Sequence, residues 1–278
     1  MRSCNDMKLA IYIGKETAQH DSRVESLFQR LRDAGMELYT LSYGEAPAKD
    51  TDMLLSVGGD GTFLYSSKLV IDSGIPVVGV NLGRVGFLSE NRPEDVADAL
   101  LSGEYTVENR AMLKAVVSPD IPSMQIWDYA LNEITVHRSG AAMLGVDVDI
   151  DGVKLPTYWA DGLVISTSSG STAYSLSVGG PIVLPESKVL IISPIAPHNL
   201  NIRPLVVPDT SKLTLKMHSR DGKFALTADN RTIEVEEEVE VRITVAQFSL
   251  RRVRLNRSNF INALTEKLFW GEDVRNIR

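Results

Sequence analysis

The chain has 278 residues and a mass of 30.6 kDa, enough for one large domain or two modest ones. Lys and Arg number 29 and Asp and Glu 36, so the formal charge is −7, which argues against a nucleic-acid partner because such proteins need a concentrated basic face. Cys4 is the single cysteine, so no internal disulfide can form. No apolar run approaches the roughly 20 residues that span a bilayer. We therefore expect a cytoplasmic protein with no nucleic-acid and no membrane partner.

The first hundred residues alternate predicted strands and helices. Apolar, β-branched runs indicate strands, and apolar residues at i, i+3, i+4 and i+7 indicate helices. The expected strands are 8–13, 37–41, 52–57 and 75–80, and the expected helices lie near 22–34, 63–72 and 93–101. This alternation predicts an α/β domain with a parallel, doubly wound sheet.

The pattern changes near residue 103, after which short strands and turn signals continue to about residue 256. The expected strands are 105–107, 113–117, 129–137, 146–150, 163–167, 189–192, 213–217, 224–227, 239–245 and 248–255. Asp151–Gly152 and Asp221–Gly222 predict hairpin turns. Ser258 is a plausible cap for a final helix. We therefore predict an α/β domain at 1–102, completed by 257–278, and an all-β domain at 103–256.

An anion-binding loop is predicted where the strand at 52–57 runs into Gly58-Gly59-Asp60-Gly61-Thr62. Glycines let the backbone approach an anion, and a helix N-terminus offers N–H groups, so Gly58, Gly59 and Thr62 are candidate phosphate-binding residues. Asp60 fits beside a phosphate if a divalent cation bridges them, or if Asp60 accepts a proton from an attacking hydroxyl. The alternative is a tight turn in which Asp60 caps the helix.

A second loop, 81–88, also follows a strand and therefore lies at the carboxyl end of the same sheet, where open α/β sheets bind ligands. Arg84 is its candidate phosphate contact, and the alternative is a solvated arginine. The hydroxyl-rich segment 166–181 suits a polar ligand such as a nucleoside, with Tyr174 as a stacking face; the alternative is a flexible linker. In Asn132-Glu133 one side chain is expected to be buried, satisfied by a ligand or by a neighbouring loop.

Together, these segments resemble the NAD kinase family in order and spacing. The matching segments are GGDGTFL at 58–64, NLGRVGFL at 81–88, LNE at 131–133, DGLVIST at 161–167 and GSTAYSLSVGGP at 170–181. GGDGT also occurs in diacylglycerol-type lipid kinases, whereas GSTAYSLS together with Asn-Glu is more specific. The resemblance implies an N-terminal α/β domain, a β-sandwich-like second domain that binds the dinucleotide, and a C-terminal helix that returns to the first domain.

The resemblance also implies an enzyme that phosphorylates the adenosine ribose 2′-hydroxyl of NAD, giving NADP. It implies ATP as donor, a divalent cation, most simply Mg²⁺, and a homotetramer or homodimer. Asp60 is then the proton acceptor and contacts NAD with Gly61. The other implied NAD-binding residues are Asn132, Glu133, Asp161, Thr172, Ala173, Tyr174, Ser175, Leu176, Ser177 and Arg231. The metal ligands stay open, and Asp60 is one possibility.

The sequence departs from the family pattern in three places. Ser168-Ser169 replaces Pro-Thr in the hydroxyl-rich loop, which removes a fixed φ angle. Asn230-Arg231 stands where Gly-Gln is usual, and we expect Asn230 to take the left-handed backbone of that turn. Tyr65 stands where many members carry a basic residue. Two other functions stay open at this stage, a lipid kinase that shares GGDGT and a non-catalytic NAD(H)-binding regulator.

Overall fold

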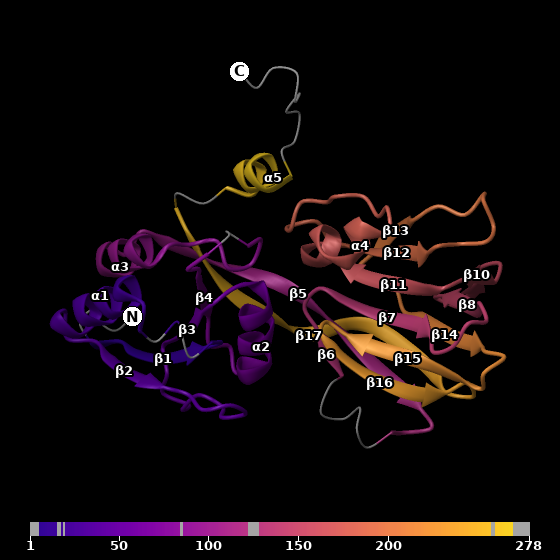
Figure 1. Cartoon of the computed structure of the whole chain (residues 1–278), viewed down its shortest axis with the longest axis horizontal. Helices are drawn as coiled ribbons and strands as arrows, with labels where there is room; N and C mark the ends of the chain where they lie inside the picture. The colour runs from indigo at the N-terminus through magenta and orange to yellow at the C-terminus, as the bar shows by residue number, and fades with distance from the viewer. Residues whose placement is uncertain are drawn as a thin grey trace. The chain divides into compact units, whose positions relative to one another are not determined.

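The computed structural model describes residues 6–15, 18, 20–83, 86–121, 128–256 and 259–268. The chain divides into two compact units, which are treated separately below (Figure 1). Unit 1 comprises residues 1–109 and 250–278, and unit 2 comprises residues 110–249. Two long strands, β5 (Tyr105–Ser118) and β17 (Glu240–Leu255), run from one unit into the other along the chain. Within the ranges given above, no helix is both long enough and apolar enough to cross a membrane.

Unit 1 is built on a parallel sheet. Its strands are β1 (Lys8–Ile13), β2 (Glu37–Thr40), β3 (Met53–Val57) and β4 (Val77–Val80), and its helices are α1 (Ser22–Asp33), α2 (Asp60–Val70), α3 (Pro93–Ser102) and α5 (Phe260–Leu268). The strands lie in the order β4–β3–β1–β2, and all their pairings are parallel. The predicted parallel sheet is confirmed. The expected capping residue Ser258 lies outside the described residues.

Helices cover both faces of this sheet. Leu55 and Val57 of β3 belong to one apolar cluster with the buried residues of α1 and α3. Ser56 points to the opposite face, where its Oγ accepts a hydrogen bond of 2.8 Å from Ser66 of α2. Neighbouring strand residues face opposite sides of a sheet, so α2 packs on the face away from α1 and α3. The sheet is doubly wound, as expected.

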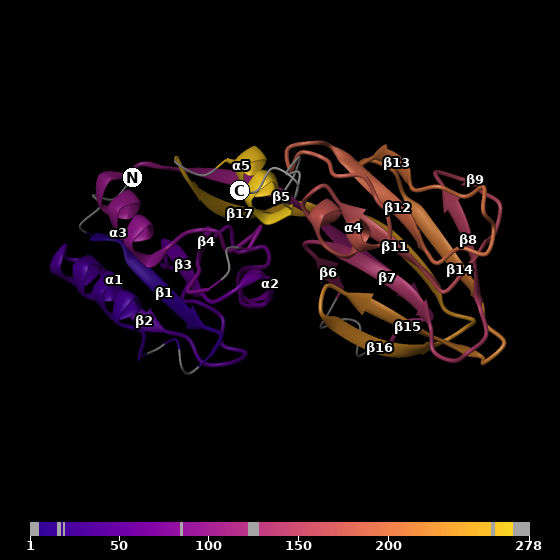
Figure 2. The same cartoon turned by 45° about the horizontal axis from the view of Figure 1, so that its top comes forward.

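Unit 2 is a sandwich of two antiparallel sheets (Figure 2). One sheet contains β8 (Leu144–Ile150), β9 (Val153–Lys154), β10 (Tyr158–Ala160), β14 (Leu213–His218), β6 (Tyr129–Ala130) and the unit 2 parts of β5 and β17. The other runs in the order β13 (Leu205–Pro208), β12 (Val189–Ile195), β11 (Gly162–Thr167), β7 (Glu133–Arg138), β15 (Lys223–Ala228) and β16 (Arg231–Glu236). Buried apolar residues of both sheets form one core. The only described helices of unit 2 are a 3₁₀ turn, Ser169–Thr172, and α4 (Tyr174–Ser177).

Several predicted boundaries are wrong. The pairs 105–107 with 113–117 and 239–245 with 248–255 are single strands, β5 and β17. In β5 the polar interruption at Glu108 is tolerated because Arg254 of β17 forms an ion pair of 2.6 Å with it. Asp221–Gly222 is a turn, but it joins β14 to β15, which belong to different sheets, so it closes no hairpin. The helix expected from residue 63 begins earlier, at Asp60.

Candidate active site

The glycine loop of unit 1 forms the tight passage from β3 into α2. Gly58 has a φ angle of 150°, and a Cβ atom there would lie 2.3 Å from Oγ1 of Thr62, so no larger residue fits without a shift. Around Gly59 and Gly61 there is open space, since a Cβ atom on either would meet nothing within 4 Å. The loop backbone at the start of α2 is therefore approachable, which is what a phosphate cradle requires.

Asp60 is the first residue of α2, and its carboxylate is held by a neighbouring loop. Oδ2 accepts a hydrogen bond of 2.9 Å from the N–H of Phe87, and Oδ1 accepts bonds of 3.1 and 2.8 Å from the N–H groups of Leu88 and Ser89. The cap position belongs to Gly59, which has no side-chain cap. The alternative, in which Asp60 caps the helix, is therefore wrong, and its carboxylate faces the backbone of residues 87–89 instead.

The approach of this loop to Asp60 depends on Gly86. A Cβ atom at Gly86 would lie 1.8 Å from Oδ1 of Asp60, closer than any real contact. Ser89 also fastens the loop to the glycine turn, because its Oγ donates a bond of 2.6 Å to the carbonyl of Gly58. Asn81 holds the other side through a bond of 2.7 Å from its Nδ2 to the Ser89 carbonyl. The candidate Arg84 lies outside the described residues.

Lys267, which the sequence did not single out, contacts the same loop. Its ammonium group donates to the Gly86 carbonyl and lies 4.0 Å from the centre of the Phe87 ring. Burial lowers the pKa of Lys267 to about 8, against an opposing effect of the Asp60 charge. Helix α5 therefore brings a positive charge to the loop that holds Asp60.

In unit 2, Asp229 organises the Leu131-Asn132-Glu133 segment. Its buried carboxylate accepts backbone hydrogen bonds of 2.9 Å from Leu131, 2.8 Å from Asn132 and 3.3 Å from Glu133. Asp229 itself has a φ angle of 52° and begins the turn between β15 and β16. The prediction that Asn230 takes the left-handed backbone conformation is therefore wrong, since Asp229 takes it instead. Its three bonds break the strand predicted at 129–137 into β6 and β7.

Glu133 is buried with one oxygen unsatisfied. Its side chain accepts from the backbone of Tyr174, whereas its Oε2 is buried and has no hydrogen-bond partner. Burial, and secondarily the charge of Asp229, raises the pKa of Glu133 to about 8. A buried acceptor without a partner is costly, so this atom is a candidate ligand contact.

The hydroxyl-rich loop packs directly on this segment. Thr167 Oγ1 donates a bond of 2.7 Å to the Leu131 carbonyl, and a Cβ atom at Gly170 would lie 2.2 Å from the Asn132 carbonyl. Ser169 Oγ is buried without a hydrogen-bond partner. The side chain of Tyr174 is among the exposed large apolar groups. The loop is therefore ordered and is not a flexible linker.

Of the other predicted residues, Ser175 and Arg231 contact neighbouring parts of unit 2, whereas Asp161 lies at the opposite end of β7 and β11 from Glu133, because Gly162 pairs with His137 and Ser166 with Glu133. Ser175 is buried, and its Oγ lies 3.2 Å from that of Ser193. Asp161 forms an ion pair of 2.7 Å with Arg138. Arg231 is largely buried, and its guanidinium donates to the carbonyls of Ala228 and Tyr129.

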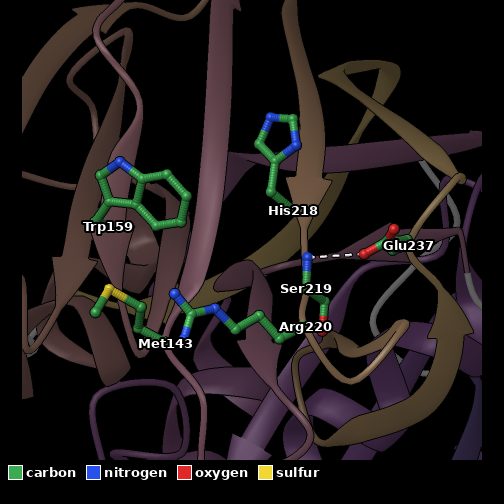
Figure 3. A pocket seen from close by; sticks show the side chains of 6 residues that line it. All are labelled: Met143, Trp159, His218, Ser219, Arg220 and Glu237. Carbon is green, nitrogen blue, oxygen red and sulfur yellow. Dashed lines mark hydrogen bonds between the residues drawn. The ribbon is translucent and has the colours of Figure 1, made fainter.

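A separate pocket of about 470 Å³ lies elsewhere in unit 2 (Figure 3). Its lining residues are Met143, Trp159, His218, Ser219, Arg220 and Glu237. The carboxylate of Glu237 accepts a bond of 2.9 Å from the Ser219 N–H. None of the predicted site residues lines it, so the pocket contributes nothing to the candidate site.

The chain matches two family models, the ATP-NAD kinase N-terminal domain over residues 8–105 and the ATP-NAD kinase C-terminal domain over residues 131–255. Among curated proteins it is 43% identical to a NAD kinase of Flavobacterium psychrophilum, covering 82% of this chain and 79% of that protein. It is 37% identical to a NAD kinase of Bacteroides fragilis, covering 97% of this chain and all of that protein.

Two solved structures share the fold. One is a NAD kinase from Archaeoglobus fulgidus in complex with ATP, with a TM-score of 0.77, 28% identity and coverage of 95% of this chain and 99% of that one. The other is yeast NADH kinase complexed with NADH, with a TM-score of 0.81, 24% identity and coverage of 98% and 90%. The chain therefore belongs to the NAD kinase family and is an enzyme, a kinase that phosphorylates NAD.

Proposed function

We propose that the chain transfers a phosphoryl group from ATP to the adenosine ribose 2′-hydroxyl of NAD, giving NADP. The observation that supports this proposal most is the position of Asp60. It is the first residue of α2, directly after the glycine loop, and its carboxylate accepts hydrogen bonds from three backbone N–H groups of the neighbouring loop. Phosphoryl transfer has a loose transition state, so positioning and charge neutralisation dominate its catalysis. A rigidly placed carboxylate meets the first need, and a divalent cation would meet the second.

Asp60 is the proposed proton acceptor for the attacking hydroxyl. A carboxylate offers about four lone-pair positions, and three are used by Phe87, Leu88 and Ser89. One position is left to orient a hydroxyl and take its proton as the phosphorus–oxygen bond forms. The glycine backbone at 58–59, together with Thr62, contacts the phosphates in this proposal.

In unit 2 we assign NAD binding to two groups. Asn132 and Glu133 lie on the segment fixed by Asp229, and the unsatisfied Oε2 of Glu133 is available to a sugar or amide donor of the dinucleotide. The residues from Thr172 to Ser177 supply hydroxyls and the exposed ring of Tyr174. Asp161 is not grouped with these residues, because it lies at the opposite end of β7 and β11 from Glu133 and forms an ion pair with Arg138. The guanidinium of Arg231 donates to the carbonyls of Ala228 and Tyr129, and we propose on this ground that it holds β6 in place rather than contacting NAD.

A divalent cation, most simply Mg²⁺, fits the chain in one way. Within the described ranges there is no group of three His, Cys, Asp or Glu side chains arranged to hold a metal. Mg²⁺ commonly binds through substrate phosphates, so the donor's phosphates would hold it, and the one free position of Asp60 stays with the hydroxyl. When bound, the cation would neutralise phosphate charge. Asp60 would orient the hydroxyl.

We also propose a homodimer or homotetramer. Strand β13 lies at the edge of its sheet and exposes Leu205 and Val206, while Leu200 nearby in the chain is 82% exposed. Exposed apolar side chains beside an open strand edge favour association. A single cysteine fits a cytoplasmic location. Light scattering of the purified protein tests the assembly, and a monomer at micromolar concentration contradicts it.

Product analysis tests the reaction itself. Purified protein is incubated with NAD, ATP and Mg²⁺, and the product is separated and its phosphate position determined by ³¹P NMR. We expect NADP with phosphate on the 2′-oxygen, and loss of the reaction on chelation with EDTA. A parallel reaction with a diacylglycerol tests the lipid-kinase alternative, for which we expect no product. Phosphate on any other hydroxyl contradicts the proposal.

A further inference from the structure

Three tyrosines of unit 1 form an aromatic stack that the reaction described above leaves unused. Tyr12 of β1 and Tyr65 of α2 have ring centres 4.8 Å apart, and Tyr43 stacks on Tyr65 at 4.9 Å with an angle of 18° between the rings. The stack runs outward, because Tyr12 is half-buried whereas Tyr43 is 80% exposed. A nearly bare aromatic ring at the end of an ordered stack is a surface on which a flat ring can bind.

The stack is fixed before any ligand arrives. The Tyr65 hydroxyl accepts a bond of 2.7 Å from the N–H of Gly44, which ties the Tyr43 loop to α2. The same loop is closed by Glu45, whose carboxylate accepts a bond of 2.8 Å from the Ser42 N–H. A preformed surface avoids much of the entropy cost of ordering on binding.

The stack also lies beside the glycine loop. Gly14, two residues after Tyr12, is so close to α2 that a Cβ atom there would lie 2.1 Å from Oγ1 of Thr62. Thr62 and Tyr65 are one helical turn apart, so the contacts of Gly14 with Thr62 and of Tyr12 with Tyr65 are successive contacts between β1 and α2. Along the axis of α2, Tyr65 lies ~7.5 Å from Asp60, from the rise of 1.5 Å per residue. The stack and the candidate phosphate cradle are therefore neighbours in unit 1.

Charge at the stack suits a phosphorylated ligand. The ammonium group of Lys68, one turn after Tyr65 on α2, lies 5.9 Å from the centre of the Tyr65 ring. Lys15 is exposed and follows Gly14 directly. Aromatic rings with nearby cations bind nucleotides by stacking and by charge together.

We propose that the outer face of Tyr43 is the stacking platform for the adenine base of the phosphoryl donor ATP. The proposal rests on the proposed function, since it deepens the donor side of that reaction. The base stacks on the ring of Tyr43, while the triphosphate extends toward the glycine loop at the start of α2. Stacking recognises the face of the base. We therefore expect purine nucleotides to bind more tightly than pyrimidine nucleotides, because their rings are larger, and we expect the hydrogen-bonding edge of adenine to contribute little to the affinity.

Steady-state kinetics of NADP formation test the platform with Tyr43→Ala and Tyr43→Phe. We expect Tyr43→Ala to raise the KM for ATP by about tenfold, the size of one base–aromatic stack, and to leave the KM for NAD within about twofold. Tyr43→Phe keeps the ring and should keep the KM for ATP. Val153→Ala, at an exposed apolar side chain of unit 2, is the control for a surface change.

Calorimetric titration with ATP compares the same variants without turnover, so the test does not depend on NADP formation. An unchanged affinity for ATP in Tyr43→Ala overturns the platform. So does a rise in the KM for NAD in place of that for ATP, which indicates the other adenine-bearing substrate. Absence of NADP formation by the wild-type protein contradicts the proposed function alone, because the ATP titration still decides the platform.

Discussion

Replacing Glu133 by glutamine is expected to stabilise the folded protein in a pH-dependent way. The pKa of Glu133 is raised to about 8 from an ordinary value of 4.5, chiefly by burial. Between these two values the unfolded chain releases the proton while the folded protein retains it. Wild-type stability therefore falls as pH rises from 4.5 to 8, by about 1.4 kcal/mol per pH unit in the middle of that window.

Glutamine has the shape of the protonated acid and does not titrate, so the variant escapes this loss. The free energy of unfolding of Glu133→Gln minus that of the wild type should grow by about 2.5 kcal/mol between pH 5.5 and 7.5. Above pH 8 the difference should stop growing, since both states of the wild type are then ionised. The variant should also raise the KM for NAD, because an amide nitrogen replaces the oxygen Oε2 that we assign to a donor group of the dinucleotide.

Urea unfolding followed by circular dichroism at several pH values between 5.5 and 9 measures this difference. Glu238→Gln, at an exposed glutamate of the same unit, is the matched control and should show a difference that does not vary with pH. A constant difference for Glu133→Gln as well refutes the reasoning, since Glu133 is then ionised in the folded protein throughout.

Two further substitutions test how each unit holds its candidate residues. Gly86→Ala forces the loop away from Asp60, so the kcat of NADP formation should fall at least about tenfold, because small misplacements of a reacting group are costly. Gly83→Ala is the control: its Cβ atom meets only Asn81 Oδ1, at 4.0 Å, so its kcat should stay near that of the wild type. Asp229→Asn turns one acceptor into a donor against backbone N–H groups, so urea unfolding should show a loss of about 1–3 kcal/mol. A comparable loss in Asp151→Asn, at an exposed turn with the same φ angle of 52°, contradicts that explanation.

The sequence predicted the parallel sheet of unit 1 because its central strands β3 and β4 are short and buried on both faces. β3, for example, is buried at all five positions and reads as an uninterrupted apolar run. The antiparallel unit was predicted in class but not in detail. The sequence did not predict the break between β6 and β7, because that break is caused by Asp229, which lies 98 residues beyond Leu131 in the chain. Local patterns carry no information about such a partner.

The candidate site shows the same division. Glycine-rich and hydroxyl-rich loops are local signals, and the sequence located both. Lys267 was missed because a lysine in an amphipathic helix is ordinarily a solvated residue, and its contact with Gly86 joins residues 181 apart. The role of Asp229 as organiser of Asn132 and Glu133 was missed for the same reason, although its place at a turn before Arg231 was visible.

The most direct test of the central claim is the turnover of Asp60→Asn, measured with the affinity of the same protein for NAD. Asparagine keeps the size of the side chain and one acceptor oxygen but cannot take a proton. With folding checked by circular dichroism, we predict that kcat falls by about 10²–10⁴-fold, as expected for loss of a general base. The dissociation constant for NAD should change by no more than about threefold. Turnover close to that of the wild type contradicts the account, because the hydroxyl then loses its proton to another group.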